Sequence, residues 1–308
     1  MSYRGKTPRS LELQYIIKLR KILKQTKHII ERDILSVLPS VVAEYALQFR
    51  QDSIEDLDAA FNRARAAASE YLSDVSKRVA DEIGGSVSKW NSTLINKEIT
   101  RELKGNAIKK ETKRTVAALT KERLKGGDTR PYIKKLKTLQ ETETKKILIQ
   151  KHSAFQYKTE PWLRESLKIF STENASLIQS NNMRLLSETQ QMVYSSMQAG
   201  ERHEEIAKKL FARKKNALGH VSPYRKAETR AAIIARDQVS KLNGDLTRIR
   251  QEKTGVKKFI WRTAGDGRVR PSHRSFANNI YTWKSGASGI LPGQDVLCRC
   301  YAEPVLDI

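Results

Sequence analysis

The chain ends in two stretches that decide its fold: Phe259-Ile-Trp-Arg-Thr-Ala-Gly-Asp-Gly-Arg-Val-Arg-Pro-Ser-His-Arg274 and Leu291-Pro-Gly-Gln-Asp-Val-Leu-Cys-Arg-Cys-Tyr-Ala-Glu-Pro304. Both cysteines of the protein, Cys298 and Cys300, lie here, together with His273, one of its five histidines. A Gly-rich segment joins the two stretches, whereas the rest of the sequence has the pattern of charged helices. This change in composition predicts a separate small unit, where specific chemistry would be found.

Alternating apolar residues predict two strands in this unit. Val256, Phe259 and Trp261 have the period of two that is typical of a strand, and residues 301–306 form a second short run. We expect the Cys-Arg-Cys segment to return beside the strand of Trp261. Residues i and i+2 of a strand point to the same face, so both sulfurs would lie near His273. Arg299 would lie on the opposite face, where it could pair with a carboxylate such as Asp266.

Helical periodicity predicts that the rest of the chain is mainly α. Helices are expected at about 10–35, 54–83, 88–125, 131–157, 162–170, 174–198, 204–213 and 226–253. Expected breaks are Pro39, Gly84-Gly85, Gly126-Gly127, Gly200 and Gly255. The fold class is therefore an elongated, basic, helical N-terminal region over 1–160, followed by a small α+β domain over 161–308.

The net charge of +24 indicates a polyanionic partner, with nucleic acid first and an anionic membrane second. Between Lys97 and Lys151 there are 17 basic and 7 acidic residues, a local net charge of +10. This segment is either an exposed helical hairpin with a solvated face or a surface that meets DNA phosphates. The candidate DNA-contacting residues are Lys109, Lys110, Lys113 and Arg114.

Neither a signal peptide nor a membrane helix is expected. Basic residues interrupt the first apolar segment, and no run approaches the ~18 apolar residues that a spanning helix needs. Cys298 and Cys300 are too close in sequence for a relaxed disulfide, so we expect synthesis in a reducing cytoplasm and no membrane partner.

Charged side chains are concentrated after the first strand, at Asp266, Arg268, Arg270, His273 and Arg274. The structural interpretation is that Asp266 accepts hydrogen bonds from turn amides, and that Arg268 or Arg270 links it to the Cys-Arg-Cys segment. Acid–base chemistry by Asp266 and His273 is the alternative, but the sequence shows neither a nucleophile nor a group to orient it. We therefore expect no catalytic residues.

A metal is a further alternative, because His273, Cys298 and Cys300 offer the donors that zinc prefers. The interpretation that we favour from the sequence is two small buried thiols beside a hydrogen-bonded histidine, with no cofactor. The sequence has no P-loop, no dinucleotide fingerprint and no His-Glu-x-x-His signature. Its four tryptophans are scattered, so they do not predict a stacking platform for single strands.

The C-terminal region resembles the phage head morphogenesis family, the Mu F-like minor head proteins. The matching residues are Ile234-Ala-Arg-Asp-Gln238, Trp261 to His273, and Cys298-Arg299-Cys300-Tyr-Ala-Glu-Pro304, in that order. The resemblance covers about 175–308. Family members often carry another Cys or His near the position of Pro292, and some carry Cys at the position of Arg270, so this chain has fewer potential metal ligands.

The resemblance implies a non-enzymatic minor protein of a tailed-phage head. Such a protein would associate with the portal protein and with capsid or scaffold proteins during assembly in the host cytoplasm. It would stay in the virion near packaged double-stranded DNA and assist DNA packaging or ejection. A nuclease-like DNA-processing enzyme and a plain DNA-binding protein are the alternatives, although no groove-reading motif is evident.

Overall fold

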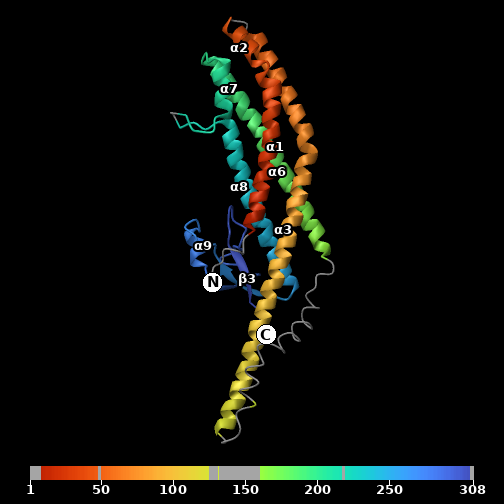
Figure 1. Ribbon diagram of the computed structural model, residues 1–308, viewed down its shortest axis with the longest axis vertical. Helices are drawn as coiled ribbons and strands as arrows, with labels where there is room; N and C mark the ends of the chain where they lie inside the picture. Colours follow the sequence, from red (N-terminus) through yellow and green to blue (C-terminus); the bar gives the residue numbers. More distant parts are fainter. Residues whose placement is uncertain (1–7, 48–49, 125–130, 132–159, 217–218, 306–308) are drawn as a thin grey trace. The chain divides into compact units, whose positions relative to one another are not determined.

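The computed structural model describes residues 8–47, 50–124, 131, 160–216 and 219–305 (Figure 1). The helical elements are α1 (Arg9–Ile30), the π-helical turn η1 (Glu31–Leu35), α2 (Leu38–Ala46), α3 (Arg50–Leu124), α6 (Pro161–Gln198), α7 (His203–Phe211), α8 (Pro223–Lys253) and α9 (Pro271–Ser275). The strands are β1 (Lys258–Arg262), β2 (Ile280–Thr282) and β3 (Tyr301–Val305). A mainly α chain with a small α+β part near its C-terminus is thereby confirmed.

The helix expected at about 131–157 lies outside the described residues. None of the described helices is long and apolar enough to cross a membrane.

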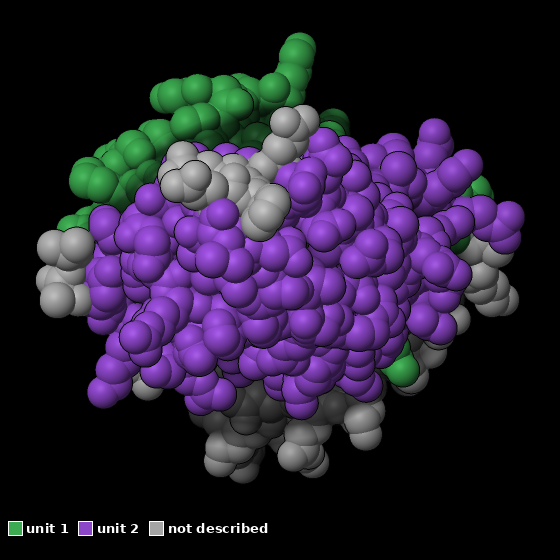
Figure 2. Space-filling model, turned by 90° about the horizontal axis from the view of Figure 1, so that it is seen from above, with its two compact units in different colours: residues 1–7, 88–161, 240–308 green, residues 8–87, 162–239 purple. Residues whose placement is uncertain are grey.

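The chain forms two compact units, and each combines segments from both sides of the expected division at residue 160 (Figure 2). Unit 1 contains residues 1–7, 88–161 and 240–308, and unit 2 contains residues 8–87 and 162–239. The grouping differs from the expected domains because helices from distant parts of the sequence pack side by side. Neither unit is a continuous piece of chain.

Unit 2 is helical, and its core combines apolar and polar side chains. On α1, Tyr15, Leu19 and Ile22 are buried, as the helical period predicted. Tyr15 donates a hydrogen bond to Asn174 of α6 (3.0 Å), and Thr26 donates one to Asn182 (2.7 Å). These bonds satisfy polar groups that would otherwise be costly to bury.

The expected break at Gly84-Gly85 was wrong, because α3 continues through both glycines. Gly84 is buried where α3 approaches α6, and a Cβ there would lie 3.1 Å from the ring of Phe170. Gly85 is exposed, and a Cβ there would meet nothing within 4 Å. The first glycine thus allows close helix packing, which compensates for the weak helix propensity of the pair.

Similarly, the two helices expected at 162–170 and 174–198 form one helix, α6. The intervening residues contain no Pro or Gly, and Asn174 donates its side-chain N–H to the carbonyl of Phe170 within the helix (2.8 Å). Three other boundaries agree with the sequence. Pro39 lies in the first turn of α2, and Gly200 and Gly255 adopt positive φ beyond the ends of α6 and α8.

In unit 1, the three strands form an antiparallel sheet in the order β2-β1-β3. Trp261 of β1 pairs with Ala302 of β3, and Phe259 pairs with Tyr281 of β2. The two outer strands therefore flank β1, as expected for β3. The sequence did not reveal β2 or the short helix α9, because both lie in the turn-rich segment where no apolar period is long enough to detect.

Gly84 and Gly85 provide a matched test of the packing in unit 2. Gly85→Ala should raise the free energy of unfolding by up to about 1 kcal/mol, because alanine favours an exposed helix interior. Gly84→Ala should gain less, since its methyl group must displace Phe170, and Gly84→Leu should lower stability by about 1–3 kcal/mol. Urea denaturation followed by circular dichroism measures all three. An equal gain from both alanine variants would contradict close packing at Gly84.

Candidate functional site: a buried imidazole and two thiols

His273, Cys298 and Cys300 come together in unit 1, as the sequence predicted. The Nδ1 atom of His273 lies 3.5 Å from the sulfur of Cys298 and 3.6 Å from that of Cys300. All three side chains are buried. The donor atoms lie within 4.8 Å of one another. The structure therefore creates a small, water-poor cluster of one imidazole and two thiols.

Local backbone geometry places each member of this cluster. His273 lies on α9, which begins at Pro271, a residue whose fixed φ suits the first turn of a helix. We had expected the thiols to lie on a strand, but this was wrong, because β3 begins only at Tyr301. A turn closed by the hydrogen bond from the N–H of Cys298 to the carbonyl of Asp295 (2.9 Å) precedes them. Both sulfurs still face His273.

Close backbone contact holds this turn against α8. A Cβ at Gly244 of α8 would lie 2.7 Å from the carbonyl oxygen of Pro292, closer than real Cβ contacts. Gly293 has a φ of +92°, and its own Cβ would meet the carbonyl of Ser240 at 3.1 Å. The two glycines therefore let the loop and the helix touch through their backbones, which fixes where the cysteines begin.

Asp295 is a member of the site that sequence reasoning missed. Its carboxylate lies 2.9 Å from Nε2 of His273. A carboxylate accepts hydrogen bonds, so Nε2 of His273 is the donor in this contact and Nδ1 faces the two thiols. The signal available in the sequence was a single acidic residue in the turn just before Cys298, which is too weak to identify a partner across 22 residues.

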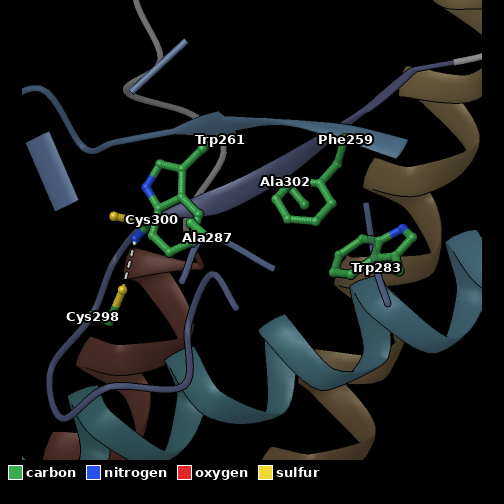
Figure 3. Close-up of a cluster of buried hydrophobic side chains, with 7 residues drawn as sticks. All are labelled: Phe259, Trp261, Trp283, Ala287, Cys298, Cys300 and Ala302. Carbon is green, nitrogen blue, oxygen red and sulfur yellow. Dashed lines mark hydrogen bonds between the residues drawn. The ribbon is translucent and has the colours of Figure 1, made fainter. Parts of the chain in front are cut away.

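Aromatic rings cover the cluster. Trp261 of β1 is fully buried, and its ring packs edge-on against His273, with 5.4 Å between the ring centroids. Phe276 packs against both rings. Trp261, Cys298 and Cys300 belong to the same buried cluster as Phe259, Trp283, Ala287 and Ala302 (Figure 3). The imidazole and the thiols are therefore part of the core of unit 1.

The two thiols differ in acidity because they share a hydrogen bond. The thiol of Cys300, helped by the backbone N–H of the same residue, lowers the pKa of Cys298 to about 6, against the effect of burial. The same pairing with Cys298, together with burial, raises the pKa of Cys300. Cys298 is thus the thiol that ionises first, and thiolate is the form that binds metals.

A second cluster forms around Asp266, which accepts from a turn amide as expected, but it is linked to the Cys-Arg-Cys segment by Arg299 and not by Arg268 or Arg270. The guanidinium of Arg299 contacts both carboxylate oxygens, at 2.8 and 2.7 Å. Arg268 adds its backbone N–H and its side chain, each at 3.2 Å. The ion pair with Arg299 lowers the pKa of Asp266 to about 2. Asp266 therefore remains charged at neutral pH and connects the turn that follows β1 to the Cys-Arg-Cys segment.

The remaining predicted residues have other partners. Arg270 donates to the backbone carbonyl of Val296 (2.6 Å), so it also braces the loop before the cysteines. The structure gives Asp266 and His273 different partners, which does not favour the shared acid–base site of the nuclease alternative. Arg114 of α3 is exposed. Lys109, Lys110 and Lys113 lie in the same helix, but their side chains are outside the described residues.

Comparison with known proteins identifies the region that carries this site. Residues 187–303 match the family described as Phage Mu protein F like protein. An "Uncharacterized protein" of Haemophilus influenzae (strain ATCC 51907 / DSM 11121 / KW20 / Rd) is 35% identical over 148 residues, 48% of this chain. The chain spans 31% of that relative's length. No solved structure matches the chain.

The ion pair of Asp266 predicts a defined dependence of stability on pH. Because its pKa is lower in the folded protein than the ordinary value of 3.8, the pair should stabilise the fold fully above about pH 4 and lose its effect as the pH falls towards 2. Asp266→Asn should cost roughly 1 kcal/mol at pH 7, since a partly exposed pair is screened by water. The difference from the wild type should shrink through that window.

Urea denaturation followed by tryptophan fluorescence at several pH values measures this difference. Asp74→Asn is the control, because Asp74 belongs to an exposed ion pair with Arg78 at one helical turn's distance. That variant should change stability by less than about 0.5 kcal/mol. A cost for Asp266→Asn that is the same at pH 2 and pH 7 would show that the charge of Asp266 does not stabilise the fold.

Proposed function

We propose that this protein is a minor head protein of a tailed bacteriophage that associates with the portal or the inner capsid during head assembly. The match of residues 187–303 to the Mu F-like family carries this proposal. The match includes every predicted residue of the C-terminal motif, from Trp261 to Cys300. In this proposal the protein contacts the portal, scaffold proteins and packaged DNA.

The site itself supports a structural role. An enzyme needs its reacting groups within reach of a substrate, whereas His273, Cys298 and Cys300 are each less than 10% exposed. Their neighbours are core aromatic rings. The partly exposed charges nearby are matched in an ion pair between Asp266 and Arg299. These features favour a cluster that stabilises the unit over one that transforms a substrate.

The charge of the chain supports proximity to DNA. A net charge of +24 would favour contact with phosphates, because each neutralised phosphate releases a condensed counterion. In this proposal, the basic segment of 97–151 contacts packaged double-stranded DNA without reading its sequence. Such contacts would allow the protein to remain in the virion and to assist packaging or ejection of the genome.

The proposed function predicts where the protein is found. It should be present in purified proheads and in mature virions of the phage that encodes it, in a constant ratio to the portal protein. A nonsense mutation in its gene should reduce the yield of DNA-filled, infectious heads while major capsid protein is still made. Quantitative mass spectrometry of gradient-purified particles measures the ratio.

Heads from a tail-deficient mutant provide the control, because a head protein must remain in them. Complementation by the wild-type gene should restore the yield of filled heads. Absence of the protein from both proheads and virions would refute the proposed function. Presence in virions but not in tail-less heads would assign it to the tail instead.

The proposed contact with phosphates predicts how DNA binding depends on salt. Binding of the full chain to duplex DNA should be indifferent to sequence and should weaken steeply with salt, with a log–log slope of about −0.9 for each phosphate contacted. Replacing Lys109, Lys110, Lys113 and Arg114 by Gln should make the slope less negative by about 0.9 for each contact removed. Fluorescence anisotropy at several salt concentrations measures the slope.

A matched variant separates local contacts from overall charge. Replacing Arg213, Lys214, Lys215 and Lys226 by Gln removes the same charge from exposed positions elsewhere. This variant should leave the slope close to that of the wild type. Equal flattening by the two variants would mean that net charge, and not the 97–151 segment, governs binding. A clear sequence preference would favour the alternative of a specific DNA-binding protein.

A further inference from the structure

We propose that His273, Cys298 and Cys300 hold one zinc ion, which joins helix α9 to the segment that leads into β3. The three donor atoms lie within 4.8 Å of one another, and each side chain is buried. Two thiolates and one imidazole are ligands that zinc prefers over harder cations such as magnesium or calcium. The inference concerns the architecture of unit 1 and does not depend on the proposed role in the phage head.

The distances between the donors fit a tetrahedral zinc site. Zinc binds thiolate sulfur at about 2.3 Å and imidazole nitrogen at about 2.0–2.1 Å, so a tetrahedral angle places nitrogen and sulfur about 3.6 Å apart. The structure has His273 Nδ1 at 3.5 Å from one sulfur and 3.6 Å from the other. An ion could therefore enter the cluster with little movement of the three side chains.

The orientation of the imidazole adds an independent argument. His273 presents Nδ1 to the two sulfurs and Nε2 to the carboxylate of Asp295, at 2.9 Å. A carboxylate that accepts the proton of one ring nitrogen leaves the other nitrogen as an electron-pair donor, which is the usual arrangement around zinc-bound histidines. Asp295 is therefore a positioning residue, which fixes the tautomer and the direction of the ligand.

Hydrogen-bond donors around the sulfurs are suited to thiolates. The backbone N–H of Cys300 lies 3.5 Å from the sulfur of Cys298 (Figure 3). Figure 3 shows the indole nitrogen of Trp261 on the side of the ring that faces Cys300, and its N–H acts as a hydrogen-bond donor to that sulfur. A metal-bound thiolate at Cys300 would accept this bond more strongly than a neutral thiol, because hydrogen bonds to charged acceptors are stronger.

Three protein ligands leave one coordination position, which we assign to a water molecule. The ion would connect two parts of the chain that are 25 residues apart, His273 on α9 and Cys298 in the loop. Between them lie β2 and the turns around Gly286 and Gly293, whose backbone hydrogen bonds are mostly local to each turn. A cross-link at this position would hold that loop against α9 and β1. The burial of all three ligands favours this structural role over catalysis at the open position.

The test begins with the full chain, purified without chelator. Elemental analysis by plasma mass spectrometry should find about one zinc per chain. Exchange of zinc for cobalt should give the visible bands of a tetrahedral ion and the near-ultraviolet charge-transfer band of a cobalt–thiolate bond. Chelation should then expose both thiols to a thiol reagent, and added zinc should protect them again. These measurements need no substitution, so they hold whether or not a variant folds.

Variants assign the ligands. Cys298→Ser and Cys300→Ser should each abolish stoichiometric zinc, and His220→Gln, at an exposed histidine, should not. Asp295→Asn should still bind zinc but with about 10–100-fold lower affinity, as expected for loss of a partner outside the metal's own ligands. Glu252→Gln is its matched control, since it removes an exposed carboxylate of the same unit that pairs with Arg248 on α8, and it should keep the wild-type affinity.

Several outcomes would overturn the inference. Absence of zinc together with absence of a cobalt–thiolate band would show that the cluster is a pair of packed thiols. Retention of stoichiometric zinc after both cysteines are replaced would place the ion elsewhere. A disulfide between Cys298 and Cys300 in protein purified under reducing conditions would contradict thiolate ligation. Unchanged zinc affinity in Asp295→Asn would remove the positioning role of Asp295.

Discussion

The buried charge of Arg250 is the constraint on which unit 1 depends. Its side chain is 1% exposed, so its guanidinium must find acceptors inside the protein. It obtains them from Glu160 at 2.8 and 3.0 Å, from Ser88 at 3.0 Å and from Asn91 at 2.6 Å. These partners come from α3 and from the residue before α6, so one buried side chain joins both segments to α8.

The network also determines where the candidate site lies. Asn91 extends it by donating to Asn243 and Thr247 on α8, which fixes how α8 lies along α3 in this unit. One turn further along α8, Gln251 donates to the carbonyl of Ala302 in β3 (3.0 Å). Together with the backbone contact at Gly244, these bonds place the sheet and the cysteine-bearing loop. The imidazole and thiols are therefore brought together in part by the polar contacts of Arg250, Asn91 and Gln251, which lie outside the cluster itself.

Buried polar side chains also align the helices of unit 2, and most of them are neutral. Asn174, Asn181 and Asn182 are buried on α6, and each bonds a different part of the unit: Tyr15, the carbonyl of Ala227, and Thr26. Arg230 adds an ion pair with Glu188, in which both side chains are mostly buried. Buried polar groups tolerate fewer alignments than apolar ones, since an unpaired group is costly. This helps to explain how a chain with only 39% hydrophobic residues specifies its packing.

The sequence alone determined the local features whose physical cause is local. Helical periods, the turn at Pro39 and the ends at Gly200 and Gly255 depend on the conformational preferences of a few neighbouring residues, and the structure agrees with them. The proximity of His273 to the thiols and the pairing of Asp266 with Arg299 were predicted from an expected strand at Cys298–Cys300, although the structure achieves both with a loop that precedes β3. Only the tertiary structure decided that α3 passes through Gly84, because the ring of Phe170, 86 residues away, makes the small residue useful within the helix. Likewise, Asp295 and Trp261 became part of the site only through folding, since a single carboxylate or indole acquires its role from the groups that surround it.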